Sequence, residues 1–126
     1  KVDNGAEYII TNYCYDNQLF FDFVERARGA GIEVPVIPGV MPIYSAKMMA
    51  SLAELCGATI TEQIKKGLAA LPEGDKGAVS EFGVQHGYQQ CKGLLEAGVP
   101  GIHIYTMDRS KSVTAIVHKL RADGLL

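Results

Sequence analysis

The sequence contains few residues of the kinds that stabilise small secreted or metal-binding domains. It has three cysteines, five prolines and no tryptophan among 126 residues. Cys14, Cys56 and Cys91 lie far apart without a CxxC pair, so their spacing indicates neither a disulfide framework nor a zinc knuckle. We expect reduced thiols, with Cys56 and Cys91 packed in the core, because both fall within apolar stripes of predicted helices.

An excess of one charge and long apolar runs are lacking as well. The formal net charge is −2 and no run of five like charges occurs, so nothing favours nucleic-acid or membrane-surface binding. No apolar stretch approaches the roughly 18 residues of a membrane span, and the first residues carry no signal-peptide pattern. Position 1 is Lys rather than Met, from which we expect further residues upstream. We therefore expect a cytoplasmic protein, with one packed domain or part of one.

Strand patterns alternate with helix patterns along the chain. Short β-branched runs predict strands, and apolar residues at i, i+3, i+4 and i+7 predict helices that begin at polar caps. We expect strands at residues 6–12, 34–39 and 101–106. Helices are expected at 17–29 after an Asp16 cap, between Ser45 and Gly57, from a Thr59 capping box to Pro72, at 75–97, and after a Ser110 cap. Gly83 and Gly87, four apart in the longest helix, indicate close packing there.

This order, β-α-β-α-α-α-β-α, predicts an α/β fold with about three parallel strands and flanking helices. Three parallel strands alone would leave two unpaired edges, so we expect missing residues or a partner chain to complete the sheet. A complete (β/α)₈ barrel has roughly 250 residues, and this chain is about half of one.

Ligands of parallel α/β sheets bind beyond the carboxyl ends of the strands. There, the amide of Asn12 and two neighbouring tyrosines suit a flat heteroaromatic ligand, although Asn12 can equally be a strand terminus without a ligand. Arg109 can grip a carboxylate or phosphate, or form a surface ion pair with Asp108. His103 is expected to be a core residue. No metal site and no catalytic residue can be assigned, because no His, Cys, Asp and Glu set has suitable spacing.

Three segments resemble the methylenetetrahydrofolate reductase family. Residues 1–16 are similar to its sixth-strand pattern, K-x-D-A-G-A-x-x-x-I-T-Q-aromatic-x-aromatic-D. Residues 36–43 resemble its I-x-P-G-I-x-P-I strand and loop, and residues 98–109 its eighth-strand pattern, G-V-x-G-x-H-F-Y-T-L-N-R. The matches occur in family order. The resemblance implies that residues 1–126 form the C-terminal half of a (β/α)₈ TIM barrel, its last three βα units.

The resemblance also implies an activity. In this family, reduced FAD passes a hydride to 5,10-methylenetetrahydrofolate, giving 5-methyltetrahydrofolate, in one-carbon metabolism and methionine biosynthesis. Matched by position, Asn12 replaces a glutamine that binds the pterin, Arg109 and Met48 fall at the folate site, and Lys1 lies near the flavin. The family's proton donor and most flavin contacts lie on earlier strands, so the segment alone is expected to be an inactive part of an oxidoreductase.

The expected partners are a folate substrate, NAD(P)H or a protein electron donor, the rest of the barrel or a partner chain, and an oligomeric assembly. Two alternatives stay open. One is a non-catalytic folate-binding or assembly half-barrel, consistent with the shorter amide of Asn12 and the apolar Met48. The other is a methyl-group enzyme of another barrel family.

Overall fold

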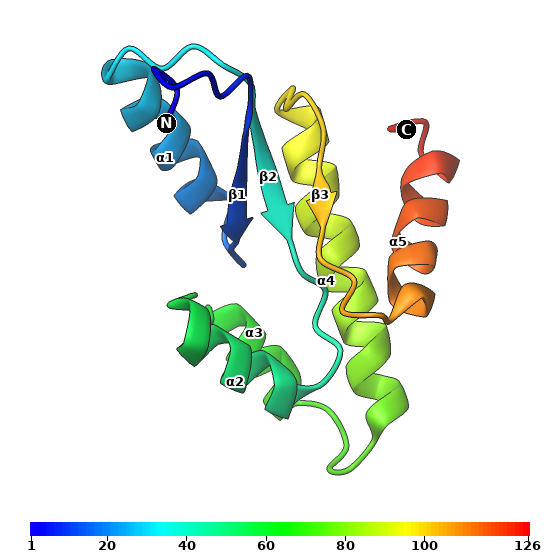
Figure 1. Ribbon diagram of the computed structural model, residues 1–126. Helices are drawn as coiled ribbons and strands as arrows, with labels where there is room; N and C mark the ends of the chain where they lie inside the picture. Colours follow the sequence, from blue (N-terminus) through cyan, green and yellow to red (C-terminus); the bar gives the residue numbers. More distant parts are fainter.

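The computed structural model describes all 126 residues and confirms the predicted α/β fold and the order of its elements. Its strands form one parallel sheet in the order β1-β2-β3 (Figure 1). The strands are β1 (Ile9–Tyr13), β2 (Val36–Val40) and β3 (His103–Ile104). The helices are α1 (Asn17–Gly29), α2 (Ala46–Cys56), α3 (Glu62–Ala69), α4 (Lys76–Glu96) and α5 (Ser110–Ala122). None of these helices is both long and apolar enough to cross a lipid bilayer.

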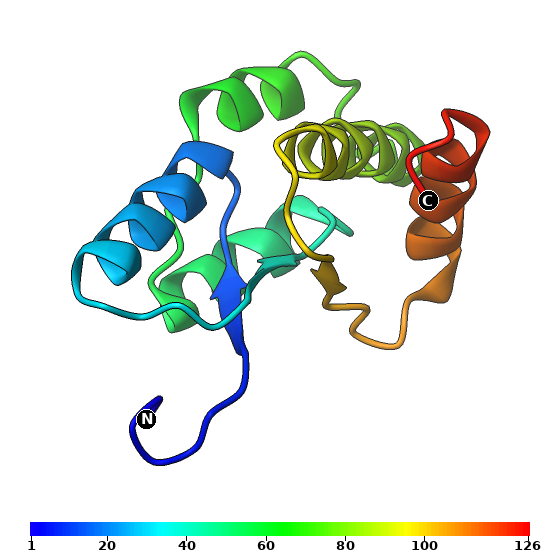
Figure 2. The same cartoon turned by 90° about the horizontal axis from the view of Figure 1, so that it is seen from above.

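Helices cover only one face of the sheet. α1, α4 and α5 lie on one side, and no helix runs along the opposite face (Figure 2). Val36 and Val40 are accordingly buried on the covered side, whereas Ile10 is 42% exposed and His103 is exposed on the open side. A doubly wound sheet would carry helices on both faces, while a barrel carries them only outside. The sheet is therefore an open part of a barrel wall.

Two apolar clusters hold these elements together. The first lies between the sheet and the helices α1, α4 and α5. Its buried members are Phe20, Val36, Val40, Cys91, Leu94, Ile116 and Leu120. The second lies beyond the carboxyl ends of the strands, where α2 and α3 pack (Figure 1). Its buried members are Tyr13, Tyr15, Met41, Ile43, Tyr44, Met49 and Ile64. The second cluster supports the strand ends at which ligands of such folds bind.

Two predicted helix caps are confirmed and two are wrong. Asp16 and Ser45 cap α1 and α2, accepting main-chain N–H groups from Gln18 and Met48. The capping box at Thr59 is wrong, because Thr61 is the extended residue whose hydroxyl accepts the N–H of Ile64. Ser110 is also not a cap. A tight turn with positive φ at residues 107 and 108 precedes the helix, so Arg109 takes the cap position without a side-chain bond.

The structure also corrects the extent of the strands. β3 has only two residues instead of the predicted six, and it pairs with β2 at Gly39 and Val40. β1 starts three residues later than predicted, and β2 starts two later. Pro38, within β2, has no N–H to donate, and the next N–H, that of Gly39, bonds the Thr11 hydroxyl at 3.0 Å. β2 therefore forms regular main-chain hydrogen bonds with its neighbours over only a short stretch.

Two predicted core residues are exposed instead. His103 lies on the sheet face that no helix covers. Cys56 ends α2, one turn beyond the buried Ala53, where Gly57 turns the chain away. Cys91, in contrast, is completely buried, as predicted. The close packing expected at Gly83 and Gly87 is confirmed, since a Cβ there would meet the main chain of Ile43 and the side chain of Ile116.

Candidate functional site

Tyr105 ties together the carboxyl ends of the strands. Its ring lies over Gly39, where a Cβ would come 2.8 Å from the ring and 2.4 Å from the Thr11 carbonyl oxygen. The Tyr105 hydroxyl donates to that same carbonyl at 3.1 Å. Glycine at position 39 is therefore required, since a side chain would displace the aromatic ring.

A second tyrosine extends this connection to Arg109. The Tyr44 hydroxyl donates to the Tyr105 carbonyl at 2.9 Å, and the Arg109 guanidinium lies 5.9 Å from the centroid of the Tyr44 ring. Such a cation–π contact holds a guanidinium without neutralising it. Arg109 forms no ion pair with Asp108 or any other acid. The predicted surface ion pair is therefore not formed, and the charge stays available to an anion.

Asn12 and Met48 have different surroundings. Asn12 is exposed next to Thr11, and its side-chain oxygen accepts the N–H of Tyr13 at 2.9 Å. Its amide nitrogen donates to no protein group, so two donors face outward. Met48 is half-buried on α2 and packs against the strand-end cluster. Asn12 therefore lies beside a groove formed with α1, Met48 in the cluster at the strand ends, and Arg109 next to Tyr44.

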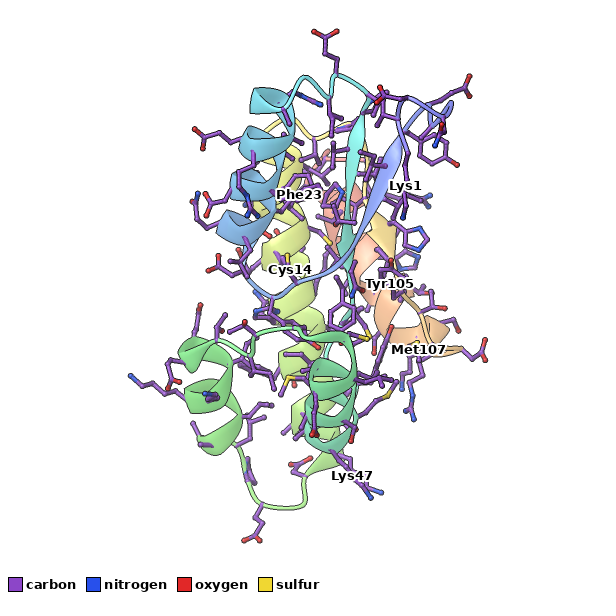
Figure 3. The ribbon with its side chains drawn as sticks, turned by 60° about the vertical axis from the view of Figure 1, so that its left-hand side comes forward. Lys1, Cys14, Phe23, Lys47, Tyr105 and Met107 are labelled. Atoms are coloured by element: carbon purple, nitrogen blue, oxygen red, sulfur yellow. The ribbon has the colours of Figure 1, made fainter.

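Lys1 is separate from these residues. The first five residues form a turn before β1, in which the Lys1 carbonyl accepts N–H groups from Asn4 and Ala6. In Figure 3 Lys1 lies toward the amino end of the sheet, and Tyr105 and Met107 lie toward its carboxyl end. Asn12 and Arg109 line separate grooves, and the roles of all four predicted site residues stay predictions.

Burial keeps the aromatic groups at the strand ends uncharged. It raises the pKa of Tyr13 to about 12, aided by the neighbouring Cys56 thiol, and that of Tyr44 to about 12 against the opposing effect of Arg109. Burial raises the pKa of Tyr15 as well, and lowers the pKa of His86, which contacts the Tyr15 ring edge-on. At neutral pH the region is therefore neutral and aromatic, with Arg109 as its cation.

The residues present fit one side of a flat ring system but not a whole dinucleotide. Ile10, His103 and Tyr105 lie on or beside the open sheet face, with the His103 and Tyr105 rings 4.6 Å apart. The chain offers no glycine-rich loop that could hold a diphosphate. A flavin would thus need groups outside these residues for its phosphates. No cluster of three His, Cys, Asp or Glu side chains is placed to hold a metal ion.

Sequence reasoning missed the linking role of the two tyrosines. Tyr105 lies within the predicted strand 101–106, but no pattern indicates that its hydroxyl reaches across β2 to β1. No sequence pattern marked Tyr44 as a site residue, because it lies directly before the cap of α2 and not at the end of a predicted strand. Both contacts join residues more than 60 positions apart, which local patterns do not report.

Helices on one face of a parallel sheet, with a polar and aromatic site at its carboxyl ends, define part of a (β/α) barrel enzyme fold. The sequence model of the methylenetetrahydrofolate reductase family matches residues 1–121. The chain belongs to this family, as its motifs predicted.

Curated relatives agree with this assignment. The chain is 36% identical to methylenetetrahydrofolate reductase 1 of Schizosaccharomyces pombe over its whole length. It is 34% identical to methylenetetrahydrofolate reductase (NADH) 1 of Zea mays and 35% identical to a probable methylenetetrahydrofolate reductase (NADPH) of Caenorhabditis elegans, each over 95% of the chain. The chain spans only about a fifth of the length of these relatives.

Proposed function

We propose that the chain forms the folate-facing part of a flavin-dependent methylenetetrahydrofolate reductase. The observation that carries this proposal is the match of the family's sequence model to residues 1–121, which include Asn12 at the end of β1 and Arg109 after β3. The free amide donors of Asn12 would hydrogen-bond the edge of the pterin. Met48 would contact the apolar middle of the ligand, and Arg109 its carboxylate.

Reduced FAD, when bound, supplies the hydride. The residues of this chain bind and orient the folate, and none is proposed to transfer a proton. Hydrogen bonds through Tyr105 and Tyr44 connect Thr11, next to Asn12, with the residue that Arg109 contacts, so a ligand held at both ends would be aligned before reaction. Lys1 would contact the flavin from outside this network. The electron donor is a nicotinamide cofactor or a redox protein.

The rest of a barrel would complete the site, supplied by the same polypeptide or by a partner in an oligomer. β1 has a free edge, and an apolar groove of about 340 Å³ runs between β1 and α1. Large apolar side chains are exposed beside it, namely Tyr8, Ile10, Leu19 and Phe23. An uncovered edge with exposed apolar groups is what an earlier βα unit would bury. By itself the segment is expected to be inactive.

The test uses the full-length gene product. We expect a flavin absorbance spectrum, and reoxidation of the reduced flavin when methylenetetrahydrofolate is added without oxygen. Asn12→Ala should lower kcat/KM about tenfold, the loss expected for one hydrogen bond to a ligand. Arg109→Ala should raise KM by about 10- to 100-fold, as for a charge-assisted bond. Asn4→Ala, in the exposed amino-terminal turn, is the matched control.

A protein that binds no flavin in its complete form would rule out the reductase proposal. A second candidate, a folate-binding half-barrel without catalysis, is favoured by the engagement of the Asn12 oxygen with its own main chain. Folate binding measured by calorimetry, without turnover in the same preparation, would select that candidate.

A further inference from the structure

Tyr44 connects the loop after β2 with the loop after β3, residues 105–109. It lies directly before the cap of α2 and is only 9% exposed. Its hydroxyl donates to the Tyr105 carbonyl at 2.9 Å, while the guanidinium of Arg109 lies over its ring, 5.9 Å from the centroid. The two loops lie side by side beyond the sheet (Figure 1). Tyr44 is therefore anchored on one residue of the second loop and supports another.

The hydroxyl bond determines where the Tyr44 ring lies. A tyrosine side chain rotates about only two bonds, and an anchored hydroxyl restricts both of them. Burial raises the pKa of Tyr44 to about 12, so the hydroxyl stays protonated and remains a donor at neutral pH. The face of the neutral ring carries the negative potential that attracts a guanidinium. Tyr44 thus contacts Arg109 and leaves the guanidinium charge unneutralised.

The main chain before Arg109 has a conformation that few residues adopt. Met107 and Asp108 have φ values of 49° and 58°, and they are the only residues other than glycine with positive φ. This conformation is unfavourable for residues with a Cβ, and it persists where the surrounding structure imposes it. The Arg109 N–H closes the turn on the Thr106 carbonyl at 2.8 Å. The turn therefore fixes the main chain of Arg109, and Tyr44 directs its side chain.

Arg109 depends on this contact because no acid holds it. Its guanidinium forms no ion pair. A long side chain without a partner samples many rotamers, and a ligand that restricts it to one rotamer loses affinity. A ring that restricts the arginine before the ligand arrives reduces that loss. The cation–π contact can therefore raise the affinity for a ligand that Tyr44 does not touch.

We propose that Tyr44 is a positioning residue for Arg109, which it holds in the orientation that binds the carboxylate end of the folate. The proposal rests on the proposed function in one respect, namely that Arg109 contacts this carboxylate. Tyr44 acts only through the arginine and needs no contact with the ligand. Its effect on affinity should therefore require both Arg109 and the carboxylate.

The test is calorimetry on the full-length gene product with two probes. One is 5-methyltetrahydrofolate, and the other is 5-methyltetrahydropteroate, which lacks the glutamate and its carboxylates. Tyr44→Leu removes the ring and should weaken binding of the first probe about fivefold, the loss expected for one cation–π contact. Tyr44→Phe keeps the ring without its anchor and should bind with an affinity between those of the parent and Tyr44→Leu. All three proteins should bind the second probe equally.

A double-mutant cycle separates positioning from a general effect on the fold. In the Arg109→Ala background, Tyr44→Leu should change the affinity for methyltetrahydrofolate by less than about twofold, the usual limit for independent sites. A purely structural role would weaken binding equally in both backgrounds and for both probes. Since Tyr44 is buried, the unfolding midpoint of each variant is measured as well, and Tyr44→Phe takes the place of Tyr44→Leu in the cycle if the latter does not fold.

Tyr88 provides the matched control. Its hydroxyl also forms a hydrogen bond, to Asp123, and Lys119 lies over its ring, 5.6 Å from the centroid. Tyr88→Leu therefore removes a similar anchored ring and a similar cation–π contact, but between α4 and α5 rather than beside Arg109. It should bind both probes like the parent.

Failure of this proposal can be told apart from failure of the reductase proposal. If Arg109→Ala binds methyltetrahydrofolate more weakly but Tyr44→Leu binds it like the parent, positioning by Tyr44 alone is refuted. An equal loss for both probes refutes it as well, and so do equal affinities of the parent and Arg109→Ala. Flavin content and turnover are measured separately, so the predicted coupling in a protein without flavin refutes only the reductase proposal. A parent that does not bind methyltetrahydrofolate overturns both.

Discussion

Gly83 should be the least replaceable glycine of α4. A Cβ at this position would lie 1.8 Å from the Ile43 carbonyl oxygen and 2.8 Å from its carbon, where real Cβ atoms almost never come closer than 3.0 Å. The obstacle is main chain and cannot rotate away, so α4 and the β2–α2 loop must separate. Overpacking of this kind typically costs about 1–3 kcal/mol, and here we expect the upper part of that range.

Helix propensity acts in the opposite direction. Alanine is about 1 kcal/mol more favourable than glycine inside a helix, so the net loss for Gly83→Ala should be about 2 kcal/mol. With a denaturant dependence of about 2 kcal/mol per molar, the urea midpoint should fall by about 1 M. Because Ile43 precedes Tyr44, the same variant should also disturb the contact of Tyr44 with Arg109.

Two other glycines of α4 provide matched controls. At Gly77 the nearest atom to an added Cβ is 3.4 Å away, so Gly77→Ala should raise the midpoint. At Gly87 the Cβ would meet the terminal methyl of Ile116 at 2.7 Å, which can rotate, so the net effect should be close to zero. If Gly83→Ala proves as stable as Gly77→Ala, with an unchanged denaturant slope, then α4 does not pack on the loop as described.

Three further predictions concern single side chains. A thiol reagent should label the exposed Cys56 quickly and Cys91 only on unfolding, as peptide mass spectrometry would show. Cys91 is buried, and burial raises the pKa of its thiol to about 12. Rapid labelling of Cys91 in the folded protein would contradict its place in the core. Burial lowers the pKa of His86, so the unfolded state takes up its proton first as the pH falls below about 6.5. The free energy of unfolding should therefore decrease below that pH, and should decrease less in His86→Gln. Equal pH profiles of the parent and the variant would refute this. Tyr44→Phe removes the donor to the Tyr105 carbonyl and should lower unfolding free energy by about 1 kcal/mol in urea titrations, whereas an unchanged value would mean that water replaces it.

The helices were predictable because their signals are local. Asp16 and Ser45 cap the helices that their sequence positions indicated, since a cap needs only its own extended backbone and an N–H two or three residues on. At Thr59 the local signal failed. Thr59 has Glu62 three residues on and Thr61 does not, yet Ile60 and Ile64 pack on the cluster at the strand ends and Thr61 is the cap.

Strand lengths and exposure were less predictable, because they depend on neighbours. The run at 101–106 has strand composition throughout, yet only two residues pair, since the partner strand contains Pro38 and one side of β3 has no neighbour. His103 alternates with apolar residues and was expected in the core. Its exposure depends on which face of the sheet the helices cover, and the alternation of residues in the sequence does not indicate that face.

The folate-side residues and the tyrosines that connect them differ in how they could be found. Asn12 and Arg109 follow strands directly, so the rule that ligands meet strand ends finds them from the sequence. The contacts that connect their surroundings are not found in this way, because Tyr44 and Tyr105 form hydrogen bonds that span 61 and 94 positions. No local pattern of residues indicates pairs so far apart in the chain.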